Sequence, residues 1–260
     1  MQLEASASER IDVCGLPVDS TSLDEVVARV LECCARPHGD RPLSIFSCNV
    51  DMVVKAARDP AFAATLGAAD ILTADGMPIV WLGRALGGAF PERVTGADLL
   101  PRIAAACSKV GHSLFLLGAA EGVAAEAARR LQAAHPGLRV AGTLAPAPGF
   151  DRADETLRPV IEAVRASKAD VLFVALGAPR QERLILEHGA SMGVKVALGV
   201  GAAIDMAAGR VARAPAFVQR AGAEWLWRLV QEPRRLARRY LVEDLAFFPI
   251  AWRELRKGDR

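Results

Sequence analysis

The stretch from Asp70 to Pro78 places a carboxylate, Asp75, at the end of an apolar run and directly before a glycine. This pattern predicts a buried strand, a turn at Asp75-Gly76 and a helix that begins near Pro78. Ligands of open α/β sheets bind at the carboxyl ends of the strands, so Asp75 is a candidate catalytic residue. The alternative is that Asp75 only caps the following helix, because most Asp-Gly turns have no catalytic role.

Glycine-containing turns follow four of the expected strands. Turns of this kind before a helix suit phosphate groups, because a helix N-terminus presents free amides and a partial positive charge. None of the four matches the dinucleotide fingerprint or the P-loop, and each glycine could serve only its turn. The four turns contain Gly76, Gly118, Gly177 and Gly201.

Three further side chains are candidates for binding a ligand. Arg93 lies on a long expected loop, residues 87–96, where it could bind phosphate or simply be solvated. Gln181 and Glu182 fall in the first turn of a helix that follows a strand. Gln181 could hydrogen-bond a sugar or base, and for Glu182 the alternative to a binding role is that it simply complements the helix dipole. No Asp-x-Asp motif is present for a divalent metal on a diphosphate. We therefore expect no metal cofactor, and arginines with helix amides to carry the phosphate charge.

Strand-like and helix-like patterns alternate along the first 209 residues. Continuous apolar runs at 113–118 and 171–177 are typical of strands that are buried on both faces. Ser22 and Glu25 have the spacing of a capping box that begins a helix. The alternation predicts an α/β fold with a doubly wound, mostly parallel, Rossmann-like sheet over residues 1–209.

Residues 210–260 have a different character and predict a basic, helical C-terminal appendage. They contain 12 Arg and Lys against 6 Asp and Glu, whereas the first 209 residues contain 20 against 24. Pro233 is expected in the first turn of a helix. At a regular 100° per residue, this helix would place its arginines on one side and Leu236, Tyr240, Leu241, Phe247 and Phe248 on the other. Those arginines are Arg234, Arg235, Arg238 and Arg239.

A localised basic surface favours an anionic partner. Anionic lipid or a polyprenyl diphosphate is favoured over nucleic acid, because no nucleic-acid motif accompanies the charge. A merely solvated helical face is the alternative. No apolar run approaches the length of a membrane span, and the N-terminus lacks a signal-peptide pattern. The five cysteines have no Cys-x-x-Cys spacing, so we expect buried, reduced thiols.

Taken in order, the motifs from about Ile11 to Leu241 resemble the WecG/TagA/CpsF family of bacterial glycosyltransferases. The stretches that carry the resemblance are Asn49-Val50-Asp51, Ala69-Asp70 through Asp75-Gly76, Pro91 through Leu99, Ser113 through Gly118, Leu176 through Glu182, Gly199-Val200-Gly201, Ala208 through Pro215, Glu224-Trp225, Arg228-Leu229 and Gln231 through Arg235.

The resemblance implies transfer of a sugar, of N-acetylmannosamine, glucosyl or uronosyl type, from a UDP-sugar to a polyprenyl-diphosphate-linked acceptor with inversion. The implied setting is the cytoplasmic face of the cell membrane, in teichoic acid, capsule or exopolysaccharide synthesis. Asp75 matches the family's proposed base, and the appendage would complete the site and touch the membrane. The implied substrate-binding residues are Ser47, Asn49, Arg93, Thr95, Asp98, Gln181 and Glu182, and the implied diphosphate- or lipid-binding arginines of the appendage are Arg228, Arg235 and Arg238.

Two other functions remain open on the sequence alone. One is a non-catalytic scaffold that recruits a polysaccharide assembly complex to a membrane. The other is a dinucleotide-dependent oxidoreductase, which the absent fingerprint disfavours. Apolar residues in the appendage could also pack between copies of the chain, so a homo-oligomer is a further expectation.

Overall fold

The computed structural model of the chain describes residues 8–220 and 222–258. Within them, eight strands form one sheet in the order β1-β2-β4-β3-β8-β7-β5-β6. β1 and β2 form an antiparallel hairpin, and all other neighbours are parallel. The predicted fold class is therefore confirmed. The strands are β1 (Glu9–Val13), β2 (Leu16–Ser20), β3 (Leu43–Cys48), β4 (Ile71–Ala74), β5 (Ser113–Gly118), β6 (Arg139–Leu144), β7 (Val171–Ala175) and β8 (Val196–Gly199).

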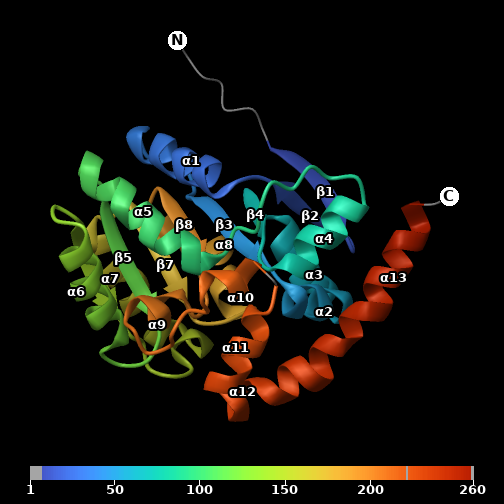
Figure 1. Ribbon diagram of the computed structural model, residues 1–260. Coiled ribbons are helices and arrows are strands. Elements are labelled where there is room, and N and C mark those ends of the chain that lie inside the picture. Colours follow the sequence, from blue (N-terminus) through green and yellow to red (C-terminus); the bar gives the residue numbers. More distant parts are fainter. Residues whose placement is uncertain (1–7, 221, 259–260) are drawn as a thin grey trace.

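Helices cover both faces of this sheet (Figure 1). One face packs against α1 (Leu23–Ala35), α5 (Gly96–Val110), α6 (Val123–Ala134) and α9 (Ala203–Ala207). The other packs against α2 (Val50–Arg58), α3 (Pro60–Gly67), α4 (Met77–Ala85), α7 (Asp154–Ser167) and α8 (Arg180–Met192), and the short turn η1 (Phe150–Arg152) precedes α7.

The buried strands explain the apolar runs in the sequence. In β5, Leu114 and Leu116 belong to one core and Phe115 and Leu117 to the other. Successive side chains of a strand point to opposite faces, so a strand with helices on both sides is apolar at every position. The two cores thus form the three-layer arrangement predicted from the alternation of elements.

Local signals also have their expected effect. The Ser22 hydroxyl accepts a hydrogen bond from the Glu25 backbone N–H, and the Glu25 carboxylate accepts one from the Ser22 N–H, so the predicted capping box is confirmed. At the end of β5, Gly118 has φ +106°, and a Cβ there would lie 2.4 Å from the Ala175 carbonyl oxygen. Only glycine allows β5 and β7 to approach so closely at this edge.

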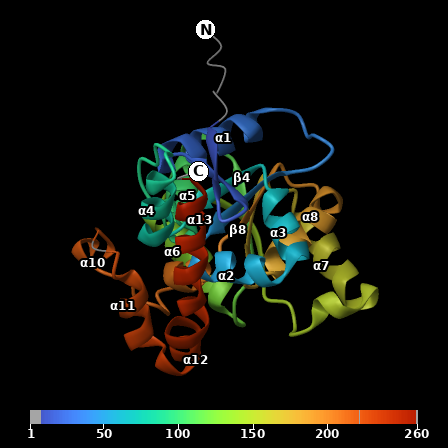
Figure 2. The same ribbon diagram turned by 90° about the vertical axis from the view of Figure 1, so that its right-hand side faces the viewer.

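The C-terminal segment lies along the carboxyl edge of the sheet and then packs back against α2 (Figures 1 and 2). Pro233 occupies the first turn of its helix, as predicted. None of the described helices is both long and apolar enough to cross a membrane. The elements of the segment are α10 (Ala216–Arg220), α11 (Glu224–Gln231), α12 (Pro233–Arg238), η2 (Arg239–Glu243), η3 (Asp244–Ala246) and α13 (Phe247–Gly258).

The regular projection of this segment is wrong beyond Arg238. There the chain passes from α12 into a π-helical turn, η2, and then into a 3-10 turn, η3, so the angle per residue changes twice. As a result Arg239 turns inward, with a side chain 29% exposed, whereas that of Arg238 is 84% exposed. Leu241 and Phe248, projected onto the apolar side with Leu236 and Phe247, are exposed, whereas Leu236 and Phe247 are buried.

Candidate active site

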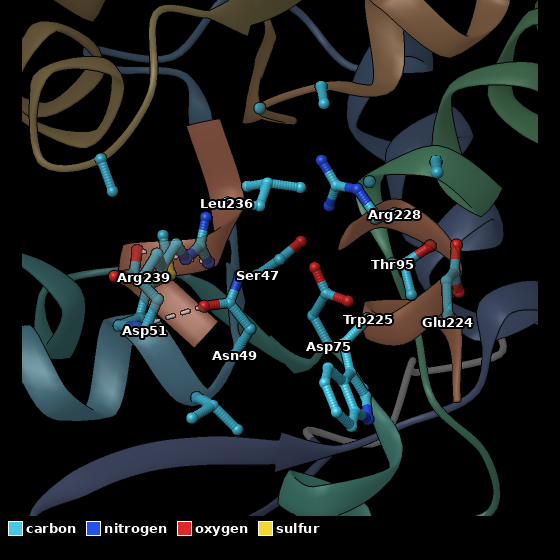
Figure 3. A pocket seen from close by; sticks show the side chains of 18 of the residues that line it. Ser47, Asn49, Asp51, Asp75, Thr95, Glu224, Trp225, Arg228, Leu236 and Arg239 are labelled. Atoms are coloured by element: carbon cyan, nitrogen blue, oxygen red, sulfur yellow. Dashed lines mark hydrogen bonds and ion pairs between the residues drawn. The ribbon is translucent and has the colours of Figure 1, made fainter. Parts of the chain in front are cut away.

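A cavity of about 1070 Å³ lies over the carboxyl ends of five adjacent strands, β4, β3, β8, β7 and β5. The body forms its floor, and residues of α11, α12, η2 and η3 form its other wall (Figure 3). The cavity therefore lies at the edge where open α/β sheets bind ligands, and the appendage contributes to the same cavity.

Asp75 follows the last residue of β4 and lines this cavity. Its backbone N–H donates to the Cys48 carbonyl oxygen at 2.8 Å, which fixes the turn against β3. The helix after it, α4, is capped by Gly76 at φ +104°, without a side-chain hydrogen bond. The alternative that Asp75 is only a helix cap is therefore wrong.

The surroundings of Asp75 raise the pKa of its carboxyl to about 6. Burial is the largest cause, because it penalises the charged form, and the negative charge of Glu224 adds to it. The positive charges of Arg228 and Arg93 act in the opposite direction. A carboxylate with this pKa is a stronger base than an ordinary aspartate and is still mostly ionised at neutral pH.

Two polar residues at the end of β3 line the cavity beside Asp75 (Figure 3). Ser47 is buried in the strand. Asn49 caps α2, and its amide oxygen accepts a hydrogen bond from the Met52 N–H at 3.1 Å. Because the oxygen is used by the helix, the amide nitrogen is the group that Asn49 offers to a ligand. The structure thus brings Ser47 and Asn49 together with Asp75.

On one side of Asp75, ion pairs join the appendage to the body. Arg93, whose side chain is 14% exposed, pairs with Glu224 of α11 at 2.6 Å and donates to Gln219 of α10. Arg213 pairs with Asp98 at 2.5 Å and approaches Glu224 at 4.0 Å. We call these four charged residues, Arg93, Asp98, Arg213 and Glu224, the Arg93–Glu224 cluster. The cluster holds α11 over the cavity.

Thr95 and Asp98 are hydrogen-bonded to each other but differ in their position relative to the cavity. Thr95 lines the cavity and caps α5, because its hydroxyl accepts from the Asp98 N–H at 3.1 Å. The same hydroxyl donates to the Asp98 carboxylate at 2.7 Å. Asp98 is not among the cavity-lining residues and instead pairs with Arg213. The structure therefore assigns Asp98 a supporting position rather than the direct contact expected from the sequence.

The three expected arginines of the appendage are placed differently. Arg228 lines the cavity, and its Nε is buried without a hydrogen-bond partner among the described residues. Arg238 does not line it; its exposed side chain pairs with Glu243 at 3.0 Å. Arg235 belongs to α12, but its side chain lies outside the described ones. Arg239 also lines the cavity, although a regular helical projection of the arginine run does not distinguish it from Arg238.

A second charged group lies on the other side of Asp75. Asp51 accepts from Lys55 at 2.8 Å and lies 3.4 Å from Arg239, whose Nε lies 3.7 Å from Asp244. We call these four residues the Asp51–Arg239 cluster. Both carboxylates are largely buried, and three members, Asp51, Arg239 and Asp244, line the cavity. This cluster joins η2 and η3 to α2.

Gln181 and Glu182 form a buried pair at the start of α8. The Gln181 amide oxygen accepts from the Gly201 N–H at 3.2 Å, and its nitrogen donates to Glu182 at 2.7 Å. Gln181 lines the cavity, whereas Glu182 lies behind it, fully buried, with its pKa raised to about 7 by burial. Glu182 therefore orients Gln181 from behind the cavity wall, and it lies in the first turn of α8, the position at which a carboxylate complements the helix dipole.

Three of the four glycines expected in turns at the site line the cavity, and the fourth does not. Gly76, Gly177 and Gly201 line the cavity, but Gly118 does not, and Ala119 and Ala120 contribute in its place. Among residues 8–220 and 222–258, no three His, Cys, Asp or Glu side chains form a group that could hold a metal ion. The expectation that no cofactor is needed stays a prediction.

Comparisons with known proteins agree with the motif pattern. A family model described as "Glycosyl transferase WecG/TagA/CpsF family" matches residues 11–260. The chain is 32% identical over 194 residues to an N-acetylglucosaminyldiphosphoundecaprenol N-acetyl-beta-D-mannosaminyltransferase of Bacillus spizizenii. The aligned residues cover 75% of this chain and 73% of the relative. It is 28% identical over 262 residues to the enzyme of the same name from Staphylococcus aureus, and that alignment covers 99% of this chain and 96% of the relative.

The environment of Asp75 has a measurable effect on stability. Because its folded-state pKa is raised above the unfolded value, the group stabilises the fold at low pH, and this contribution is lost as the pH rises through about 6. Above that pH, Asp75→Asn is expected to increase the free energy of unfolding by about 1–2 kcal/mol. Denaturant unfolding at several pH values measures this. A matched control is Asp40→Asn on an exposed loop, and an equal effect of the two substitutions would contradict the assignment.

Proposed function

The chain belongs to the WecG/TagA/CpsF family of glycosyl transferases, and we propose that it transfers an N-acetylmannosaminyl-type sugar from a UDP donor to a polyprenyl-diphosphate-linked acceptor sugar. The observation that supports this proposal most strongly is Asp75, a carboxylate with a raised pKa, in a cavity that has arginines on one side and an apolar rim. The names of the relatives from B. spizizenii and S. aureus, each an N-acetylmannosaminyltransferase acting on an undecaprenyl-diphosphate-linked sugar, support the donor and acceptor classes.

In the proposed reaction, Asp75 removes the proton of an acceptor hydroxyl while that oxygen attacks the anomeric carbon of the donor. The bond from that carbon to the donor diphosphate breaks, and UDP leaves with the bonding electron pair. Because attack and departure occur on opposite faces in a single displacement, the configuration inverts. This step needs a base at the acceptor and positive charge at the leaving diphosphate.

The charge balance supports the Arg93–Glu224 side as the position of the leaving group. Arg93, Arg213 and Arg228 face two carboxylates, Glu224 and Asp98, which leaves one cation, Arg228, to act on Asp75 and on a bound diphosphate. Arg93 and Arg213 are paired with Glu224 and Asp98, whereas Arg228 lines the cavity with no ion-paired carboxylate among the described side chains, so we assign Arg228 the diphosphate. The turns at Gly177 and Gly201 add backbone amides at the same edge.

The function is tested by UDP release from a panel of UDP-sugars, with and without a short-chain GlcNAc-diphosphate-lipid. We expect release that depends on the acceptor, with UDP-N-acetylmannosamine as the preferred donor. Lipid binding without release from any donor would favour a scaffold. Quenching of nicotinamide fluorescence on titration would instead favour an oxidoreductase.

The pH dependence of turnover follows from the raised pKa of Asp75. As Asp75 acts only when ionised, kcat/KM is expected to rise with pH and level off above about 6. Asp75→Asn is expected to lower kcat by about 10²-fold or more, with donor binding retained. Pre-steady-state product formation at each pH measures the chemical step. Near-normal turnover of the asparagine variant would contradict the assignment of the base.

Arg228 and Arg238, the two expected diphosphate-binding arginines whose side chains are described, offer a matched pair of substitutions. Arg228→Gln removes the free positive charge of the cavity and is expected to lower kcat/KM for the UDP donor by about 10- to 100-fold. Arg238→Gln changes an exposed side chain outside the cavity and should leave it within about twofold. Steady-state kinetics with varied donor separate the two. Equal losses would indicate that overall charge, rather than a diphosphate site, is important.

We also propose that the appendage docks on the cytoplasmic face of the cell membrane without crossing it. Leu245, Phe248 and Trp252 are exposed and three to four residues apart, and Arg253 and Arg256 lie beside them. Such a mixture suits insertion at the headgroup level of an anionic bilayer. A homo-oligomer formed through this apolar surface remains the alternative use of it.

Vesicle flotation of the full chain tests this docking. Trp252→Glu is expected to weaken binding to vesicles with about one third anionic phospholipid by tenfold or more, because it removes apolar insertion and adds repulsion. Val110→Glu, at an exposed apolar position on α5, is the matched control. If Trp252→Glu instead changes only the sedimentation state, the surface is an interface between copies.

A further inference from the structure

The mechanism above does not use the Asp51–Arg239 cluster, although three of its residues line the cavity. Asp244 is 8% exposed, and its Oδ1 is buried without a hydrogen-bond partner among the described residues. The Nε of Arg239 is also without such a partner. Burying a polar atom without a hydrogen-bond partner raises the free energy of the fold. Two such atoms in the wall of one cavity therefore indicate that a polar ligand supplies their partners.

The charge of the cluster indicates which ligand this is. Its two carboxylates, Asp51 and Asp244, are balanced by Lys55 and Arg239. Buried Glu182 lies within electrostatic reach of Lys55 and Asp51, so the cluster holds no surplus positive charge for an anion. Carboxylate acceptors beside a guanidinium donor suit the hydroxyl groups of a neutral sugar.

The position of the cluster indicates which of the two sugars binds there. In Figure 3, Asp51 and Arg239 lie on one side, Arg228 and Glu224 lie on the other, and Asp75 lies between them. In a single displacement the base touches the acceptor hydroxyl, so donor and acceptor meet at Asp75 from opposite sides. With the donor diphosphate on the Arg228 side, the remaining side belongs to the acceptor.

The rim of the cavity supports the same assignment. Leu241, Leu245 and Phe248 line it and are each more than half exposed. They follow directly on Arg239 and Asp244 along η2, η3 and α13. A lipid-linked acceptor carries an apolar chain beyond its sugar and diphosphate, and an apolar rim close to a sugar subsite suits such a molecule.

We propose that Asp51, Arg239 and Asp244 form the subsite for the acceptor's sugar and determine acceptor specificity, an inference that rests on the proposed transferase function. Asp51 and Asp244 accept hydrogen bonds from sugar hydroxyls, and Arg239, which lies close to both carboxylates, donates one. A site built to hydrogen-bond a hydroxyl strongly rejects an analogue that lacks it, since its own polar groups are left unpaired.

The test uses the full chain with a short-chain GlcNAc-diphosphate-lipid and with those monodeoxy analogues of it that keep the attacking hydroxyl. Asp51→Asn and Asp244→Asn keep the shape of the side chain and are each expected to raise the acceptor KM about tenfold or more. The donor KM and the slow acceptor-independent hydrolysis of the donor should stay within about twofold. Glu243→Gln, which changes an exposed neighbour paired with Arg238, is the matched control and should alter neither KM.

The deoxy analogues give the second measurement. Wild-type protein should lose about tenfold or more in kcat/KM with at least one analogue, and the corresponding asparagine variant should no longer distinguish that analogue from the natural sugar. If donor and acceptor KM rise together, or if both variants still discriminate, the cluster only clamps the appendage and the inference is wrong. If wild-type protein releases no UDP with any donor and acceptor, the proposed function itself fails, and the subsite assignment fails with it.

Discussion

Ion pairing between the appendage and the edge of the sheet is the interaction on which the site depends. Glu224 is held by Arg93 and approached by Arg213, and Arg239 lies against Asp51 at the opposite end of the cavity. Exposed ion pairs contribute little, about 0–1 kcal/mol each. The Arg93–Glu224 pair is largely removed from water, so loss of one partner would leave an unpaired buried charge. The two clusters therefore fix α11, η2 and η3 over the strand ends.

This arrangement sets the chemistry of Asp75 from both sides. The appendage forms one wall of the cavity around Asp75 and brings Glu224 near it, which raises its pKa, and it also brings Arg228, which limits that rise. The same segment exposes Phe248 and Trp252 to the surroundings. One segment therefore both completes the cavity and presents an apolar surface beside it.

The sequence predicts the sheet and its buried strands well because apolar runs and turn glycines are local signals. It also predicts Asp75 as a site residue, because the end of a strand is recognisable from its pattern. Arg239 and the burial of Glu182 could not be predicted in this way. Arg239 depends on a change of helical pitch after Arg238, and the place of Glu182 depends on Gln181 and Gly201, which come together only in the folded chain. Contacts between distant segments leave no periodic signal.

The most direct test of this account is the pKa of Asp75, measured by carboxyl ¹³C NMR in the wild-type chain and in the variant Arg213→Ala/Arg239→Ala. The account predicts a value of about 6 in the wild-type chain. Loss of one cation from each cluster should loosen the appendage, rehydrate Asp75 and lower the pKa toward that of an ordinary aspartate, about 4. An ordinary value in both proteins, or about 6 in both, would contradict the claim that the docked appendage creates the base.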